Sequence, residues 1–289
     1  MSGPSIRRLP DGRRLHLRHG PIDIVAEAFG DRERCEAAYR ALAAAFRGLL
    51  EGLVAELPLL RRPVTGLSAK PVARSPVARR MVEAVWPHRG LFVTPMAAVA
   101  GAVADHLLAA MSEGTGLDRA YVNNGGDIAL MLTPGTILRC LAVGRFETAE
   151  ADLLVEIRAG DPVRGVATSG RGGRSFTLGI ADAVTVLAAD AAAADAAATL
   201  IAGAVDVAHP AIRRRPARAL DPDSDLGDRP VTVEVGPLEP EAVEAALEAG
   251  AACAGAMLEA GLIDAAALRL QGERRLLGRP TTQLFVTKT

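Results

Sequence analysis

Apolar residues recur at two different spacings along this chain, so the pattern predicts both strands and helices. Residues 14–18 alternate polar and apolar side chains, and the alternation returns at residues 22–25 after a turn, which predicts an opening β-hairpin. Asp31 is a suitable N-cap for a long helix that reaches about Leu57. Pro58 is expected to end this helix.

The rest of the chain mixes further helices with short strands. Helices are expected over residues 76–86, 94–108, 191–204 and 239–260. Strands are expected over residues 120–123, 128–132, 137–143, 153–157, 165–169, 175–178, 183–187, 231–235 and 283–286. The intervals 58–74 and 212–230 are predicted loops, the first basic and rich in proline, the second rich in Arg and Asp. With no internal repeat and no sharp boundary, the chain is expected to form a single α/β domain over residues 1–289.

Composition narrows the classes of function. The net charge of −1 gives no general attraction to nucleic acid, and 3% aromatic residues provide few surfaces for stacking bases. The most apolar tract, residues 180–207, is interrupted by four aspartates, and residues 1–8 lack the apolar region of a secretory signal. We therefore expect a cytoplasmic protein that does not enter a membrane. Cys35, Cys140 and Cys253 are far apart and odd in number, so reduced, buried thiols are expected.

The first candidate site is Asn123-Asn124-Gly125-Gly126-Asp127, which lies between two predicted strands. Gly125 and Gly126 permit positive φ and close approach of a ligand to the backbone, and Asp127 follows them directly. The same sequence is also that of an ordinary β-hairpin turn. Both interpretations remain open at this point.

The second candidate is the loop Thr168-Ser169-Gly170-Arg171-Gly172-Gly173-Arg174-Ser175, at the end of a predicted strand. Backbone N–H groups in such a loop form an anion-binding nest, and Arg171 or Arg174 could hold a phosphate with two hydrogen bonds. It is not a Walker loop, because the Gly-Lys-Ser/Thr ending is absent. The alternative is a solvated hairpin loop.

The third candidate is the pair Asp195 and Thr199 in the Ala-rich helix. At positions i and i+4 they share one helical face, and a carboxylate with a hydroxyl suits Mg²⁺, which takes few protein oxygens and keeps water and phosphate ligands. The alternative is that Thr199 bonds back to the helix while Asp195 faces water. The neighbouring residues are almost all apolar, which argues against an ordinary solvated face for Asp195.

Taken in order, these motifs resemble the ApbE-like superfamily of FAD:protein FMN transferases. The matching segments are a Gly-x-x-x-Asp helix (Gly101 and Asp105), a strand entering a Gly-Gly-Asp turn (residues 120–128), a Thr-Ser-Gly strand end (residues 166–170), and a strand followed by an Ala-Asp-Ala-x-x-Thr helix (residues 183–187 and 194–199). The resemblance covers residues 91–207 and implies an α+β fold with mixed or antiparallel sheets packed against helices.

The chain departs from the transferases at two places. Ala100 stands where the family has Lys before the glycine of the upstream helix. The family's His-x-x-Asp-Pro-x-Thr-Gly segment is missing, and only residues 176–182 fill that interval. These departures match the compact, uncharacterised branch of the superfamily.

The resemblance implies a site for a flavin nucleotide. Mg²⁺ would be held by Asp195 and Thr199 against the pyrophosphate of FAD, and FMN would pass to a hydroxyl of an acceptor protein or to water. The phosphate or nucleotide would contact Thr168, Ser169, Gly170, Arg171 and Arg174, and the pocket wall would include Gly125, Gly126 and Asp127. The alternatives are a non-catalytic binding protein for a flavin or another phosphorylated small molecule, and a different transferase on the same scaffold.

Overall fold

The computed structural model describes residues 3–145, 150–279 and 284–286. The chain divides into two compact units whose segments interleave along the sequence. The first unit comprises residues 1–138, 158–166 and 189–195, and the second comprises residues 139–157, 167–188 and 196–289. The expectation of one domain over the whole chain stays a prediction.

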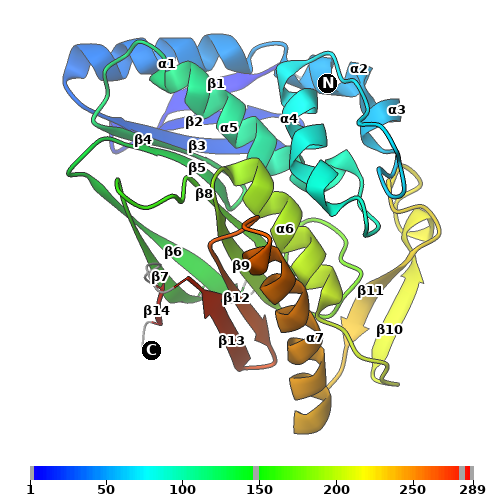
Figure 1. The fold of residues 1–289 in the computed structure, drawn as a ribbon. Helices are drawn as coiled ribbons and strands as arrows, with labels where there is room; N and C mark the ends of the chain where they lie inside the picture. The colour runs from blue at the N-terminus through cyan, green and yellow to red at the C-terminus, as the bar shows by residue number, and fades with distance from the viewer. Residues whose placement is uncertain (1–2, 146–149, 280–283, 287–289) are drawn as a thin grey trace. The chain divides into compact units, whose positions relative to one another are not determined.

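The first unit is an antiparallel sheet packed with helices (Figure 1). Its strands, in hydrogen-bonded order, are β1 (Ser5–Arg8), β2 (Leu15–His19), β3 (Ile22–Phe29), β4 (Arg119–Asn124), β5 (Asp127–Leu132) and the beginning of β8 (Gly165–Ser169). Its helices are α1 (Arg32–Phe46), α2 (Leu49–Ala55), α3 (Leu57–Leu60), α4 (Pro76–Val85) and α5 (Val99–Ser112), with the 3-10 turns η1 (Trp86–His88) and η2 (Pro95–Ala98). Helix α5 packs on β4 and β5, and α1 packs on α5 and β3.

Helix α5 is apolar because it is a core helix of this unit. Among the described residues, the stretch Pro95–Ser112 is long and apolar enough to cross a membrane by length and composition, but half of it is buried inside the fold. Leu107 and Met111 are fully buried, as is Phe46 of α1. The apolar face of α5 therefore packs against protein, as the 3.6-residue period of a core helix requires.

The long helix expected from Asp31 to Leu57 is interrupted, so that prediction was wrong in part. The N-cap is correct, since Asp31 accepts a hydrogen bond from the N–H of Arg34. The helix ends at Phe46 because Gly48 adopts φ of +77°, a left-handed conformation that glycine adopts without strain. Pro58 does not stop a helix but occupies the first turn of α3, where its missing N–H costs nothing.

The second unit combines three sets of strands with one long helix. The end of β8 continues to β9 (Ala183–Ala188), β12 (Ala265–Leu270) and β13 (Glu273–Gly278), in that hydrogen-bonded order. A second sheet has the order β14 (Leu284–Val286), β7 (Glu150–Arg158) and β6 (Ile137–Arg145), and a third pairs β10 (Ile212–Pro216) with β11 (Pro230–Val235). Helix α6 (Ala191–Ala204) begins in the first unit and ends here, α7 (Pro240–Glu259) packs on β12 and β13, and η3 is Ala217–Ala219.

Several sequence predictions fail in the second unit. The interval 212–230 is not all loop, because Ile212–Pro216 forms β10, whose arginines carry no apolar alternation. Residues 175–178 form no strand, although the carbonyl of Thr177 accepts a hydrogen bond from the N–H of Thr232. Strands β12 and β13 of this unit were not anticipated, and neither was β1 of the first unit. Gln283, the expected start of the last strand, lies outside the described residues.

Candidate functional site

The Gly-Gly-Asp motif forms the turn that joins β4 to β5. Gly125 and Gly126 have φ of +67° and +117°, which glycine adopts without strain. The side-chain oxygen of Asn123 closes the turn by accepting a hydrogen bond from the N–H of Gly126 at 2.8 Å. The hairpin-turn interpretation is therefore confirmed, and the turn places a buried carboxylate, Asp127, at the start of β5.

Two glycines allow the backbone before α6 to approach its neighbours. A Cβ atom at Gly101 of α5 would lie 2.1 Å from the carbonyl oxygen of Ala191. A Cβ atom at Gly165 of β8 would lie 2.0 Å from the carbonyl carbon of Asp190. Because both clashes are with backbone, neither can be relieved by turning a side chain, so these two positions accept only glycine without a shift of α5, β8 or α6.

At this close approach, each helix receives at its N-terminus a carboxylate from the other helix. Asp105 of α5 accepts hydrogen bonds from the N–H groups of Ala191 (3.0 Å) and Ala192 (2.9 Å) in the first turn of α6. Asp195 of α6 accepts one from the N–H of Gly101 in the first turn of α5 at 3.0 Å. These N–H groups have no partner within their own helix, and a negative charge there is stabilised by the helix dipole. The spacing of Gly101 and Asp105 thus has a structural cause, since both face the start of α6.

The pKa of Asp105 is raised to about 6, chiefly by burial and then by the negative charge of Asp190. The N–H groups of Ala192 and Ala191 oppose this rise, as does Arg80 of α4, whose guanidinium lies 3.8 Å from the carboxylate. Asp190 is also the N-cap of α6, because its side chain accepts from the N–H of Ala193 at 2.8 Å. The start of α6 therefore carries two carboxylates beside one another.

Asp195 lies in a more strongly perturbed environment. Burial raises its pKa well above the ordinary value for an aspartate, and the negative charge of Asp127 adds to this effect, followed by that of Asp105. Hydrogen bonds from the N–H groups of Gly101 and Ala100 act in the opposite direction. The charge of Asp127 acts on Asp195 more strongly than that of Asp105, so the structure brings two of the sequence-predicted residues, from the Gly-Gly-Asp turn and the Ala-rich helix, close to each other.

The other predicted site residues belong to the second unit. Thr199 follows Asp195 by four residues in α6, Ser169 ends β8, and Arg174 lies in the loop after it. Within residues 3–145, 150–279 and 284–286 there is no group of three or more His, Cys, Asp or Glu side chains that could hold a metal ion. A cation near Asp195 would therefore need hydroxyl, amide or backbone oxygens in addition to carboxylates.

The loop after β8 is anchored by its own contacts within the second unit. Asp182 receives the guanidinium of Arg171 through Nε at 2.9 Å and Nη2 at 2.7 Å. Gly170 lies so close to Asp182 that a Cβ atom would be 2.4 Å from its carbonyl oxygen. Thr168 shares a 2.9 Å hydrogen bond between hydroxyls with Thr185 of β9. Arg171 is thus used to fix the loop.

Comparison with known proteins gives the family. A family model described as AbpE bacteria matches residues 6–276. The chain belongs to this family. A UPF0280 protein of Methanosarcina acetivorans is 32% identical over 206 residues, which cover 71% of this chain and 77% of the relative. Another, of Methanothrix thermoacetophila, is 37% identical over 163 residues, 55% of this chain, and the chain spans only 65% of that relative.

Among solved structures, the flavin transferase ApbE from Vibrio cholerae aligns over 96% of this chain and 98% of its own, with a TM-score of 0.47 and 12% identity. The family match includes all of the motif-bearing residues 91–207. The ApbE-like resemblance drawn from the order of the motifs is therefore confirmed at the level of the family.

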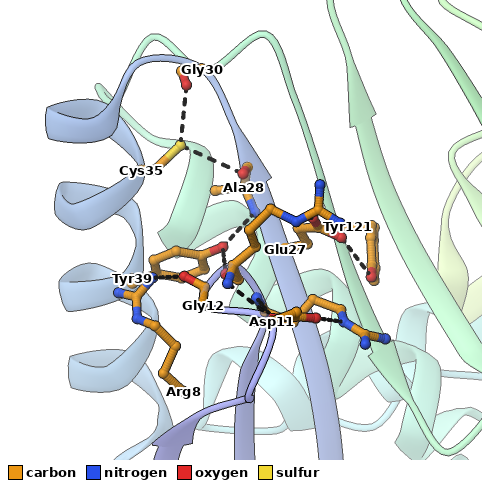
Figure 2. A network of polar contacts seen from close by, with 11 residues as sticks. Arg8, Asp11, Gly12, Glu27, Ala28, Gly30, Cys35, Tyr39 and Tyr121 are labelled. Carbon is orange, nitrogen blue, oxygen red and sulfur yellow. Dashed lines mark hydrogen bonds and ion pairs between the residues drawn. The ribbon is translucent and has the colours of Figure 1, made fainter.

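A second polar network lies in the first unit, among α1, β3 and β4 (Figure 2). Glu27 is buried and accepts a hydrogen bond from the hydroxyl of Tyr121 at 3.1 Å, with Arg13 3.5 Å from its other oxygen. Burial, followed by the charge of Glu27, raises the pKa of Tyr121 to about 12. Tyr39 accepts from the N–H of Ala28 and donates to the carbonyl of Arg13. Because Tyr121 has a raised pKa, it stays protonated at neutral pH and keeps its hydrogen bond to Glu27. The network therefore stabilises the sheet. No motif or spacing in the sequence indicated this network.

The three cysteines are free thiols. They are half-buried rather than fully buried, which corrects the expectation in part. Burial raises the pKa of Cys140 to about 11 and also raises those of Cys35 and Cys253. A raised pKa disfavours the thiolate, so the environment of these cysteines does not activate a nucleophile.

Proposed function

We propose that this member of the AbpE bacteria family is a Mg²⁺-dependent enzyme acting on a flavin nucleotide. It would cleave the phosphoanhydride of FAD and pass FMN to a hydroxyl of an acceptor protein or to water. The proposal is carried by one observation: the carboxylate of Asp195, bound to the N–H of Gly101 in the first turn of α5, has a raised pKa to which the negative charge of Asp127 contributes. It is supported by the order of the motifs inside the region that the family model matches.

The residues present fit a divalent cation. Asp127 is buried and Asp195 is half-buried, and the negative charge of Asp127 raises the pKa of Asp195, so one Mg²⁺ would balance the charge of this pair. Asp195 and Thr199 would hold the ion, with Asp127 beside it. When bound, Mg²⁺ neutralises the charge that develops on phosphate oxygens as a phosphoanhydride breaks. The N–H of Gly101 would keep the carboxylate of Asp195 oriented during this process.

The loop after β8 is proposed to contact the nucleotide phosphates. Thr168, Ser169, Gly170 and Arg174 would supply hydroxyl, backbone N–H and guanidinium donors. Arg171, which is bonded to Asp182, would keep the loop in place. We infer a positioning role for Arg171 and a binding role for the other four.

One observation favours a second candidate, a binding protein without turnover. Ala100 replaces the lysine that the transferases carry before the glycine of the upstream helix. An alanine cannot supply a positive charge to a phosphate or remove a proton from an acceptor. A protein that keeps the carboxylate pair but lacks this amine could hold a nucleotide without cleaving it.

The test is to titrate the full chain with FAD, FMN and ADP, with and without Mg²⁺, and to measure AMP and FMN by mass spectrometry. The proposal expects Mg²⁺-dependent FAD binding with release of AMP. Asp195→Asn keeps an oxygen for Gly101 but removes the charge, so it should bind FAD no better with Mg²⁺ than without. Mg²⁺-dependent binding of FAD without release of AMP would support the binding protein. If no flavin binds with or without Mg²⁺, both the enzyme and the flavin-binding protein are refuted.

A further inference from the structure

We propose that the side-chain oxygen of Asn124 is a further ligand of the divalent cation held beside Asp127 and Asp195. The inference rests on the proposed function, because it concerns the same cation. It assigns a role to a residue whose oxygen atom has no other explanation in the fold.

Asn124 and Asp127 lie on the same face of the sheet. They are directly paired across the end of the β4–β5 hairpin. Cross-strand partners place their Cβ atoms about 4.5–5.5 Å apart on one side of the sheet. Both residues are buried, and α5 packs on these two strands. The side chain of Asn124 therefore lies beside that of Asp127, on the face that α5 covers.

The orientation of the Asn124 amide is determined by its partner. Its Nδ2 donates to the backbone carbonyl of Ala100 at 3.1 Å. A carbonyl oxygen only accepts hydrogen bonds, so the nitrogen end of the amide must face Ala100 and the oxygen end must face away. With its side chain 4% exposed, Asn124 cannot turn this oxygen toward bulk water. In the described part of the chain, Oδ1 of Asn124 has no hydrogen-bond partner.

The same short segment of α5 connects Asn124 to Asp195. Ala100 accepts from Asn124, and the next residue, Gly101, donates its N–H to Asp195. Asn124 of β4 and Asp195 of α6 thus contact consecutive residues in the first turn of α5, and Asp127 of β5 is the cross-strand partner of Asn124.

Two carboxylates and one amide carbonyl are a suitable ligand set for a hard divalent cation such as Mg²⁺ or Mn²⁺. A neutral amide adds a ligand without a third negative charge, which matters because the two carboxylates already repel each other. A buried water that bonds Oδ1 is the competing explanation, since a polar site of this kind would also suit a water molecule.

The neighbouring asparagine provides a matched control. Asn123 precedes Asn124, points to the other side of the strand and uses its oxygen to close the turn through the N–H of Gly126. Serine at Asn123 removes an amide one position away but keeps a side-chain oxygen that can close the turn. Aspartate at Asn124 keeps an oxygen ligand but loses the donor to Ala100.

The experiment titrates Mn²⁺ alone into the full chain and follows binding by electron paramagnetic resonance, after circular dichroism has shown that each variant is folded. Loss of a ligand that matters should weaken Mn²⁺ binding by about tenfold or more in Asn124→Ala. Asn123→Ser should bind as the natural chain does, and Asn124→Asp should bind at least as tightly.

The outcomes separate this inference from the proposed function. Equal Mn²⁺ affinity in Asn124→Ala and the natural chain overturns the ligand role and favours the water. If Asn124→Ala does not fold, a folded Asn124→Asp decides, because reduced affinity in it overturns the inference and retained affinity supports it. If the natural chain binds no Mn²⁺ and no Mg²⁺, the cation of the proposed function fails, and this inference fails with it.

Discussion

Gly101→Ala should destabilise the protein strongly even though alanine is the better helix former. The new Cβ would lie 2.1 Å, 2.5 Å and 2.8 Å from backbone atoms of Ala191 and Ala192, so α5 and α6 must move apart. Overpacking of this kind costs about 1–3 kcal/mol. The movement also stretches the hydrogen bonds of Asp105 and Asp195 to the opposite helix, and bonds to charged groups contribute about 1.5–3 kcal/mol each. The gain in helix propensity is only about 1 kcal/mol.

The expected net loss for Gly101→Ala is therefore about 3 kcal/mol or more in the free energy of unfolding. Urea denaturation followed by circular dichroism measures it as a fall in the midpoint at unchanged slope. Gly255→Ala in α7 is the matched control, because a Cβ there meets nothing within 4 Å. It should stabilise the protein by about 0.5–1 kcal/mol. If Gly101→Ala and Gly255→Ala shift the urea midpoint in the same direction and by a similar amount, the backbones at Gly101 and Ala191 do not approach each other as closely as described.

Three further predictions concern Asp105, Tyr121 and Arg171. The pKa of Asp105 rises from 3.8 to about 6 on folding, so its contribution to stability is complete below pH 3.8 and is lost as the pH rises to 6. Relative to Asp105→Asn, the natural chain should lose about 3 kcal/mol of unfolding free energy over that window, and a flat difference in pH-dependent denaturation would contradict this. Tyr121→Phe should lower the free energy of unfolding by about 1–3 kcal/mol, because it leaves Glu27 without one hydrogen-bond partner. Ultraviolet titration of the natural chain should place the Tyr121 transition near pH 12, and a transition near pH 10 would contradict the buried environment of Tyr121. Arg171→Ala should expose the loop after β8 to proteolysis, since it removes both bonds to Asp182, whereas unchanged cleavage would show that the ion pair does not hold the loop.

The fold could be predicted from the sequence where a local signal agreed with burial. The turn between β4 and β5 has paired glycines, and α6 matches its expected bounds because its Ala-rich stretch begins after the N-cap Asp190. Strand β12 could not be predicted, because Ala265-Ala266-Ala267 has the composition of a helix, and only its pairing between β9 and β13 makes it a strand. Its hairpin turns at Gln271-Gly272, where Gln271 has φ of +47°, a conformation that a glutamine rarely adopts.

The candidate site was predictable in its residue types but not in its contacts. Asp195 and Asp127 were both expected from motifs, but only the family resemblance implied that Asp127 lies in the pocket beside the cation of Asp195, because 67 intervening residues separate the two in the sequence. The pairing of Arg171 with Asp182 was equally hidden, since a loop arginine has the same appearance in a sequence whether it binds a phosphate or a neighbouring carboxylate. Asn124 was read as part of a turn, and only its bond to Ala100 reveals which way its oxygen points.

The exchange of carboxylates between α5 and α6 has a consequence for how the first unit opens. Because Asp105 serves α6 and Asp195 serves α5, neither helix can fray at its N-terminus without releasing a side chain of the other. The amide protons of Gly101, Ala191 and Ala192 should therefore exchange with solvent deuterium through one shared opening event, with a single free energy. Two helix ends that are distant in the sequence would then behave as one cooperative element, more resistant to local melting than either terminus alone.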